Sequence, residues 1–333
     1  MSRFSASHAA GFYRTAQDLL VSTLGQGSYL GEMDDATDGA YTEAALAALD
    51  GGINFFDTSL NYRHQRSERA FGKAFRSALE GGLAARDEFA VCTKAGFLVP
   101  GAVPADLRPE EIAGNMHSTS PAFLRDQIER SRQNLGLATI DVFYLHNPET
   151  QLRFVKVEEF YSKVRSAFET LESLTAAGLI RFYGTATWDG YRRGLESGSL
   201  SLSRLAAIAE DIAGSDHHFR FVQLPFNLAM PEALTIKADG GRTVLDWAEE
   251  LGITVVASAS ILQSRLATEL PPTLAEKIRG PSTNAQRAIQ FVRSTPGISV
   301  ALVGMSQAMH VCENLGIATF PPATLDEYEQ FFR

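Results

Sequence analysis

The stretch of sequence that decides the fold is GINFFDTSLNYRHQRSERAFGKAF, residues 52–75. It opens on a short, almost continuously apolar run, INFFDTS (53–59), which is the pattern of a buried parallel strand. A helical pattern, SERAFGKAFRSALEGG, then starts at Ser67 and stops at Gly81. The stretch therefore predicts one strand–loop–helix unit.

The same unit recurs along the chain. Further apolar runs of the strand type occupy residues 19–26, 89–96, 140–147, 180–187, 219–226, 254–260 and 299–305. Helical patterns follow them, starting with TEAALAALDGG, which has Thr42 as its expected cap, and FLRDQIERSRQNLG, which follows Ser120-Pro121. Eight strands, each followed by a helix, favour parallel pairing through helical crossovers and a closed barrel.

The predicted fold class is therefore α/β, a (β/α)8 TIM barrel. We find no linker or break in composition, so residues 1–333 are predicted to form a single domain with the barrel core at about residues 20–318. An open doubly wound sheet has a similar order of elements. The glycines at Gly25 and Gly27 lack a following helix at dinucleotide-fold spacing, however, and give that alternative little support.

Charge and cysteine content narrow the class of protein. The 30 Lys and Arg residues against 39 Asp and Glu give a net charge of −9, which argues against nucleic acid as a partner. Cys92 and Cys312 make neither a disulfide framework nor a zinc-ligand set, so we expect two buried free thiols and no metal site. The sequence shows no signal-peptide pattern and no apolar run of the ~20 residues that span a bilayer. A cytoplasmic enzyme is predicted.

Polar residues close several of the predicted strands. Barrel enzymes carry their chemistry at the C-terminal ends of the strands, so these residues are expected to converge on one pocket. They are Asp57, Lys94, His146, Thr185, Thr187 and Gln223.

Four residues in this region have the chemistry to reduce a carbonyl group, which needs a hydride at carbon and a proton at oxygen. Tyr62, five residues after Asp57, would supply the proton. A free tyrosine has a pKa of ~10, and a nearby Lys94 ammonium is expected to lower it. Asp57 would hold Lys94 by an ion pair, and His146 would present an N–H to the carbonyl oxygen.

Each of the four also has a simpler structural interpretation. Asp57 could cap a turn, Tyr62 could be a partly buried loop aromatic, Lys94 a surface lysine and His146 a core histidine. Four residues of the right chemical types at consecutive strand ends favour the active-site interpretation.

At these residues the chain resembles the aldo-keto reductase family. The segment 52–75 is similar to that family's signature, in which an aspartate is followed by a tyrosine and then by Ser-Glu. CTKAG and DVFYLHNPE resemble its lysine and histidine strands. The resemblance extends from about Leu24 to Ile317 and places the catalytic tetrad on Asp57, Tyr62, Lys94 and His146.

The resemblance also implies an extended NADP(H) at the barrel mouth, with NAD(H) as the alternative cofactor. It places Gln223 on the nicotinamide carboxamide, the phosphates at the loops SASILQSRL and GMSQAMHVCENL, and Glu313 and Asn314 on the adenine. The remaining residues expected at the cofactor are Thr187, Ser258, Ile261, Ser264, Gly304, Ser306 and His310.

Three features depart from the family pattern. Ala186-Thr187 replace a common Ser-Asn, and Ser258 replaces the aromatic residue that stacks on nicotinamide in many members. Gly304 to Ser306, together with His310, stand where basic residues often grip the 2′-phosphate. Because a neutral histidine cannot form the arginine fork, acceptance of NAD(H) stays open.

The segment 98–121 follows the third predicted barrel strand and is expected to shape the substrate pocket. His117 and Met116 could contact a substrate or pack within the loop. Phe97 and Trp188 could line an apolar pocket wall or belong to the core. The predicted partner is a small carbonyl or alcohol substrate.

Three functional hypotheses follow. The first is an NAD(P)H-dependent carbonyl reductase or alcohol dehydrogenase with Tyr62 as proton donor. The second is a nucleotide-binding regulatory or redox-sensing barrel with little catalysis, suggested by the altered residues at Thr187 and Ser258. The third is a barrel lyase or isomerase that uses Lys94 as a Schiff-base amine.

Overall fold

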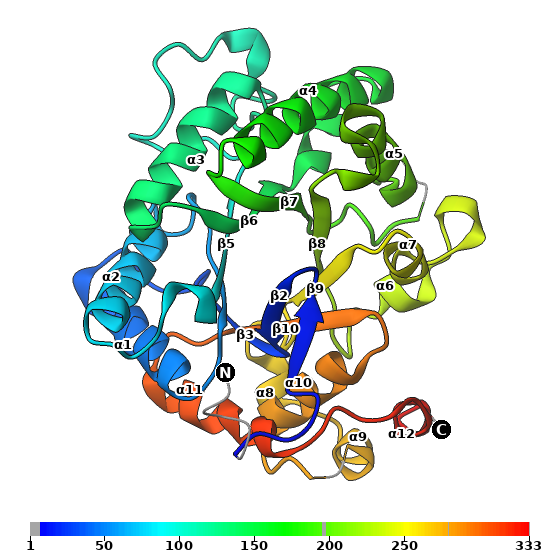
Figure 1. The fold of residues 1–333 in the computed structure, drawn as a ribbon. Helices are drawn as coiled ribbons and strands as arrows, with labels where there is room; N and C mark the ends of the chain where they lie inside the picture. The colour runs from blue at the N-terminus through cyan, green and yellow to red at the C-terminus, as the bar shows by residue number, and fades with distance from the viewer. Residues whose placement is uncertain (1–6, 195–197, 279, 333) are drawn as a thin grey trace.

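The computed structural model describes residues 7–194, 198–278 and 280–332 (Figure 1). Eight parallel strands pair in the closed order β10-β3-β4-β5-β6-β7-β8-β9, which confirms the predicted (β/α)8 barrel. The barrel strands are β3 (Leu24–Gly27), β4 (Phe55–Asp57), β5 (Ala90–Ala95), β6 (Ile140–His146), β7 (Ile180–Ala186), β8 (Phe219–Pro225), β9 (Thr254–Ser258) and β10 (Ile298–Gly304).

Helices surround the barrel in Figure 1. The longer ones are α1 (Asp35–Asp50), α2 (Arg66–Glu80), α3 (Pro121–Leu135), α4 (Val157–Ala176), α5 (Leu202–Ala213), α7 (Val244–Glu250), α10 (Asn284–Ser294) and α11 (Ala308–Leu315). Shorter helices lie in the loops and near the C-terminus, namely α6 (Glu232–Thr235), α8 (Arg265–Thr268), α9 (Pro272–Lys277) and α12 (Leu325–Gln330). Short 3-10 helices are η2 (Arg86–Glu88), η3 (Pro109–Glu111), η4 (Pro148–Arg153), η5 (Gly214–Asp216), η6 (Asp239–Gly241) and η7 (Gly316–Thr319).

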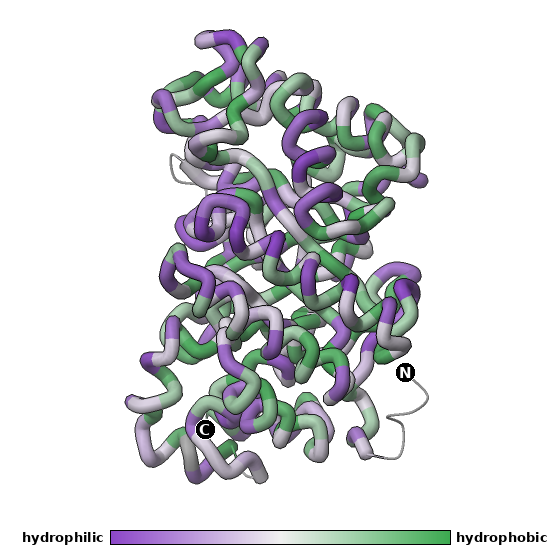
Figure 2. The backbone as a smooth tube through the Cα atoms, turned by 90° about the vertical axis from the view of Figure 1, so that its left-hand side faces the viewer, coloured by the Kyte–Doolittle hydropathy of each residue, from purple (hydrophilic) through white to green (hydrophobic). Residues whose placement is uncertain are grey.

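Successive side chains of a strand serve two different cores. Phe55 belongs to the cluster inside the barrel, with Cys92 and Val142, whereas Phe56 packs outward against Phe71 of α2. This period of two is the geometry of an extended chain with both faces buried. It explains why the strands are apolar almost without interruption, as the hydrophobic segments in the interior of Figure 2 show.

The first predicted strand, residues 19–26, is in fact divided. Its first half is β2 (Leu19–Ser22), which pairs antiparallel with β1 (Tyr13–Ala16), and only β3 belongs to the barrel. The division follows from hydrogen bonding, since the Ser22 N–H donates to Asn54 Oδ1 at 2.6 Å. Leu19 of β2 joins the interior cluster, so the hairpin closes the N-terminal end of the barrel.

Two local predictions need correction. Helix α1 begins at Asp35 under an Asp34 cap, not at Thr42, because the Asp34 side chain accepts the Thr37 N–H. Cys92 is a buried free thiol as expected, but Cys312 is exposed because it lies on the outer face of α11. Among the described residues, no helix combines the length and the hydropathy needed to cross a membrane.

Candidate active site

A cavity of about 450 Å³ lies at the C-terminal ends of the strands. Asp57 and His146 are the last residues of β4 and β6, so strand register brings both to its wall. The residues that line it are Gly27, Ser28, Tyr29, Leu30, Asp57, Asn61, Tyr62, Phe97, His146, Asn147, Ala186, Thr187, Trp188, Gln223, Ser258, Ala259, Ser260, Ile261, Gln263, Ser264, Leu302, Val303 and Gly304.

Lys94 is the centre of a buried polar cluster beneath this wall. Its side chain is fully buried, and Nζ donates to Asp57 Oδ1 at 2.6 Å and to the Thr58 carbonyl at 2.7 Å. The third contact of Nζ is with Tyr62 Oη, at 3.4 Å. Gln223 donates to the other Asp57 oxygen at 2.7 Å. The ammonium, the carboxylate and the phenol therefore form one hydrogen-bonded unit.

Burial governs the acidity of Tyr62. It raises the pKa of the phenol above its ordinary value, and the Lys94 ammonium only partly opposes this rise. We expected Lys94 to bring the pKa down, and the difference arises because the hydroxyl is enclosed. Tyr62 is consequently protonated at neutral pH and holds a proton that it can donate.

Lys94 itself stays charged. Burial alone would lower its pKa, but Asp57 and Tyr62 together raise it above the ordinary lysine value. A buried and protonated lysine is a poor nucleophile, which argues against the Schiff-base hypothesis. Its charge is available to stabilise a phenolate at Tyr62.

His146 is neutral, and its neighbours define its tautomer. Burial lowers its pKa well below the ordinary histidine value, and the nearby Lys94 charge adds to this effect. Its Nδ1 lies 3.1 Å from Asn61 Oδ1 and 3.2 Å from Ser59 Oγ. These contacts at Nδ1 leave Nε2 as the ring nitrogen that can meet a ligand, and the orientation of the Asn61 amide decides whether Nε2 presents an N–H or a lone pair. The N–H expected for the carbonyl oxygen corresponds to the orientation in which the Asn61 amide nitrogen faces Nδ1.

The loop that carries Tyr62 is held in an unusual conformation. The three residues after it, Arg63, His64 and Gln65, have φ values of 47°, 50° and 71°, in the left-handed region that side chains disfavour. Arg63 donates to Ser67 Oγ at 3.1 Å and to Asp38 at 2.6 Å. Such a conformation persists because surrounding contacts enforce it.

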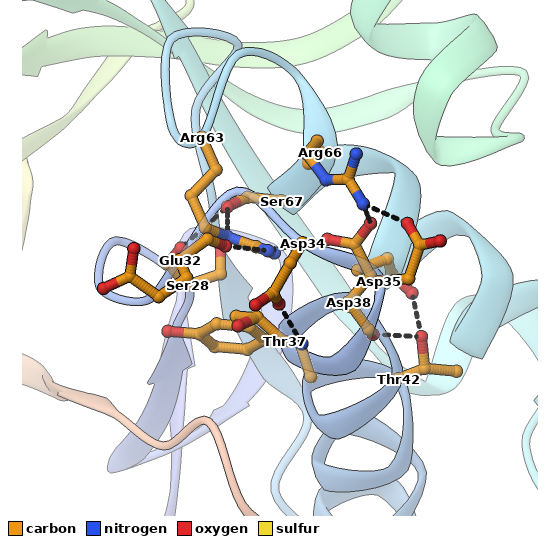
Figure 3. A network of polar contacts seen from close by, with 12 residues as sticks. Ser28, Glu32, Asp34, Asp35, Thr37, Asp38, Thr42, Arg63, Arg66 and Ser67 are labelled. Carbon is orange, nitrogen blue, oxygen red and sulfur yellow. Dashed lines mark hydrogen bonds and ion pairs between the residues drawn. The ribbon is translucent and has the colours of Figure 1, made fainter.

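Figure 3 shows the network that provides these contacts. Arg63 also donates to the Glu32 carbonyl at 3.3 Å and lies 4.9 Å from the Tyr41 ring centroid, while Arg66 pairs with Asp35 and Asp38. The network joins the Tyr62 loop to the segment 28–34, which carries Tyr29 and Leu30 at the cavity. Two loops that form one wall are thus fixed to each other.

The residues expected at the cofactor divide into two groups. The first group lines the cavity and consists of Thr187, Gln223, Ser258, Ile261, Ser264 and Gly304. The second group lies outside the cavity lining, with His310 and Glu313 exposed and Asn314 buried; it consists of Ser306, His310, Glu313 and Asn314.

Two buried polar atoms show that these positions fit a polar ligand. Thr187 Oγ1 and Asn314 Oδ1 are buried and make no hydrogen bond within the described part of the chain. An unsatisfied buried polar atom costs free energy unless a ligand or water binds it. At Gly304, a Cβ would meet no atom within 4 Å, so there is open space beside the backbone.

The residues expected at the substrate also differ in position. Phe97 and Trp188 line the cavity. His117 is fully buried and does not line it; its Nε2 lies 2.8 Å from the His146 carbonyl and its Nδ1 lies 3.2 Å from Gln151. Its place is therefore behind the strand end, where it supports His146. Met116 is exposed and does not line the cavity.

Sequence reasoning missed several residues of the cavity wall. Asn61 stands between Asp57 and Tyr62 in the printed signature, and Asn147 directly follows His146, so adjacency to predicted catalytic residues was the available signal. Tyr29 and Ser260 lie in loops just after β3 and β9. Their sequence pattern carries no comparable indication.

Comparisons with known proteins identify the family. The family model described as "Aldo/keto reductase family" matches residues 23–331, and the chain belongs to that family. Over 57% of its length it is 30% identical to a D-threo-aldose 1-dehydrogenase of a Pseudomonas species, and the alignment spans just 58% of that enzyme.

Two further proteins extend the comparison over most of the chain. A putative voltage-gated potassium channel subunit beta of Schizosaccharomyces pombe is 23% identical over 91% of this chain and 86% of its own. The crystal structure of an aldo/keto reductase from Klebsiella pneumoniae, in complex with NADP and acetate, has a TM-score of 0.69 and 18% identity. It covers 97% of this chain and 94% of that one. At this identity the likeness concerns the fold alone.

Proposed function

We propose that this protein is an NAD(P)H-dependent oxidoreductase that interconverts carbonyl and alcohol groups. Its membership of the aldo/keto reductase family supports this class of reaction. The single observation that carries the proposal is the contact of Lys94 Nζ with both Asp57 and Tyr62 at the wall of the cavity.

A nicotinamide cofactor is the group that these residues would hold, and it supplies the hydride when bound. The Klebsiella enzyme was crystallised with NADP, which supports NADP(H), and NAD(H) is the alternative. Thr187, Gln223 and Ser258 would hold the nicotinamide end, with Ile261 and Ser264. The other end would lie on Gly304, Ser306, His310, Glu313 and Asn314.

Tyr62 acts as the proton donor in this proposal. Its hydroxyl is protonated at neutral pH and lines the cavity, so it can pass its proton to a carbonyl oxygen as negative charge develops there. The Lys94 ammonium, 3.4 Å away, stabilises the phenolate that remains. Asp57 holds Lys94 in place, and Gln223 fixes the second Asp57 oxygen.

His146 orients the reacting oxygen. With its hydrogen on Nδ1, the ring can accept a hydrogen bond from an alcohol hydroxyl through Nε2. A carbonyl oxygen would need a donor, and the opposite orientation of the Asn61 amide would supply the other tautomer. The same residue can therefore serve both directions of the reaction.

The cavity favours neutral substrates that carry hydroxyl groups. As far as the described residues form it, the lining contains no lysine or arginine that would bind an anionic substrate. It combines the amides of Asn61 and Asn147 with the rings of Tyr29, Phe97 and Trp188. Amides exchange hydrogen bonds with hydroxyls, and aromatic faces cover C–H surface. The relative described as an aldose dehydrogenase is consistent with this substrate class.

A regulatory barrel that binds nucleotide with little catalysis is the second candidate. Its support is the similarity to a putative channel subunit beta, together with Thr187 and Ser258 at positions where the family often has other residues. The two candidates make the same prediction for nucleotide binding and opposite predictions for turnover.

One experiment separates them. NADPH and NADH are titrated by quenching of intrinsic fluorescence, and consumption of the tighter-binding nucleotide is then measured with aldoses, aromatic aldehydes, α-keto acids and quinones. The proposal predicts turnover that is greatest with neutral hydroxylated aldehydes. Binding without turnover of any compound supports the regulatory candidate, and borohydride trapping at Lys94 without nucleotide binding would indicate Schiff-base chemistry.

A further inference from the structure

Glu149 is a buried acid beside the cavity, outside the tetrad. It follows β6 in the short 3-10 helix η4, three residues beyond His146. Its side-chain oxygen Oε1 accepts the N–H groups of Trp188 at 3.1 Å and Asp189 at 3.2 Å. These two N–H groups belong to the segment that leaves β7. The carboxyl group therefore links the ends of two neighbouring barrel strands.

No cation neutralises this acid. Within the described part of the chain, Glu149 forms no ion pair, although the residue is only 8% exposed. The neighbouring Asp189 pairs instead with Arg192 and Arg193. Because a buried carboxylate without a cation is costly, backbone N–H groups must provide its stabilisation.

Burial raises the pKa of Glu149 to about 7, although backbone N–H groups, including those of Trp188 and Asp189, act to lower it. The other titratable groups at this place are Tyr191, whose pKa burial raises far above 10, and the Asp189–Arg192–Arg193 cluster. Tyr191 donates to or accepts from Thr185 at 2.8 Å. The pKa of Glu149 thus places a change of its charge near neutral pH.

The segment that Glu149 holds carries two residues of the cavity wall. The hydroxyl of Thr187 is buried and has no hydrogen-bond partner in the described chain. Trp188, the second residue, is 43% exposed and lines the cavity. The Thr187 N–H donates to the Gln223 carbonyl at 2.9 Å. The segment is therefore fixed on one side by β8 and on the other side by Glu149.

We propose that Glu149 is a positioning residue, whose carboxylate holds the segment after β7 so that Thr187 and Trp188 present their side chains to the bound ligand. The proposal rests on the proposed function for the identity of that ligand. The mechanical part of the proposal is that Glu149 holds the backbone of Trp188 and Asp189. This part does not depend on the proposed function. When Glu149 is protonated or replaced by glutamine, the bonds to Trp188 and Asp189 lose their ionic character and weaken.

Trp188 fluorescence tests the mechanical part without any turnover. The chain has two tryptophans, so Trp247→Phe leaves Trp188 as the single reporter. Acrylamide quenching of Trp188 is measured from about pH 5 to about pH 9, and we expect quenching to decrease with a midpoint near the Glu149 pKa of about 7. In Trp247→Phe with Glu149→Gln the titration is expected to vanish.

The matched control is Glu158→Gln, which removes an exposed acid at the start of α4. With this control substitution, Trp188 quenching is expected to show the same pH dependence as in the Trp247→Phe parent. A titration that persists in Glu149→Gln, or one that is absent from the Trp247→Phe parent, overturns the proposal. The second outcome needs no substitution at Glu149, so the proposal stays testable if that variant does not fold.

Kinetics test the ligand part. For Glu149→Gln in the full enzyme we expect KM, or the dissociation constant of the nucleotide, to rise about 5- to 10-fold while kcat changes less than about 3-fold. Equal KM values in the variant and the wild type contradict the role toward ligand. If the wild type shows no turnover at all, the proposed function fails, and Trp188 quenching still decides whether Glu149 holds the segment.

Discussion

The two halves of the cavity are built differently. The tetrad half, Asp57, Tyr62, Lys94 and His146, is fixed by strand ends and by direct contacts such as the 2.6 Å ion pair of buried Lys94. The loop half starts with residues 258–264, most of which line the cavity after β9. It continues with residues 304–314, which run from Gly304, at the cavity wall and the end of β10, beyond the cavity lining into α11. Four residues of its first segment, Ala259, Leu262, Gln263 and Ser264, have positive φ values, and much of its second segment is exposed.

Under the proposed function, this difference separates proton transfer from nucleotide recognition. Proton transfer depends on fixed sub-ångström geometry, which strand ends with buried charges provide. Nucleotide recognition depends on hydrogen bonds distributed over a long ligand, which loops can provide even when single residues change. The tetrad half should therefore lose activity steeply on substitution, and the loop half should change affinity gradually.

Lys94→Met tests whether activity falls steeply when a residue of the tetrad half is replaced. It removes the ammonium beside Tyr62, so we expect turnover to fall about 1000-fold. It also leaves buried Asp57 without its cation, which should cost about 3 to 5 kcal/mol of unfolding free energy in urea.

The double variant Asp57→Asn with Lys94→Met separates these two effects. It removes both charges, so it is expected to recover most of the stability and none of the activity. Activity that returns together with stability would show that Lys94 acts only through the fold.

Arg63→Met tests whether the network in Figure 3 belongs to the tetrad half. The Arg63 side chain is 3% exposed and contacts Ser67, Asp38 and the Tyr41 ring, so its loss should cost about 3 kcal/mol of unfolding free energy. We also expect lower kcat, because the left-handed turn after Tyr62 would relax. Arg69→Met, on the exposed face of α2, is the control; unchanged kcat in Arg63→Met would place the network outside the catalytic unit.

The pH dependence of stability tests the buried acid that links the ends of β6 and β7. The folded-state pKa of Glu149, about 7, lies above the ordinary value of 4.5, so its contribution to stability is complete at low pH and is lost as pH rises through about 7. Between about pH 5.5 and about pH 8, wild type should lose about 2 kcal/mol of unfolding free energy relative to Glu149→Gln. Parallel pH profiles of the two proteins in urea unfolding would contradict this.

His310→Arg tests the loop half and should have the smallest effect. His310 is exposed on α11, where the family often has an arginine. An arginine fork can bind a 2′-phosphate, so affinity for NADPH should rise about 3- to 10-fold and affinity for NADH should stay unchanged. A large loss of turnover in this variant would contradict the expectation that substitutions in the loop half change affinity and not catalysis.

The sequence was sufficient for the barrel and for the residues at strand ends. Hydrophobic runs separated by helical patterns predicted the eight-stranded order, and strand register then forced Asp57, Lys94 and His146 to one end. Residues whose position depends on long-range hydrogen bonds were not predictable. The first predicted strand divides after Ser22, whose N–H donates to Asn54 Oδ1, and the His117 ring contacts the His146 carbonyl and does not line the cavity.

Burial explains why the pKa of Tyr62 differs from the expectation. The sequence shows that Lys94 can approach Tyr62, but only the enclosed structure shows that burial raises the pKa of the phenol despite that approach. Likewise, the His146 tautomer depends on which atom of Asn61 faces Nδ1. Glu149 ends the quoted segment DVFYLHNPE, but its role was not predictable, because its partners are backbone N–H groups from another strand end.

Turnover by Tyr62→Phe, measured together with nucleotide affinity on the same sample, tests the central claim most directly. The variant lacks only the hydroxyl that contacts Lys94, so the account predicts a loss of about 1000-fold or more in kcat and an NADPH dissociation constant within about 3-fold of wild type. Carbonyl reduction by Tyr62→Phe at the wild-type rate would contradict the account.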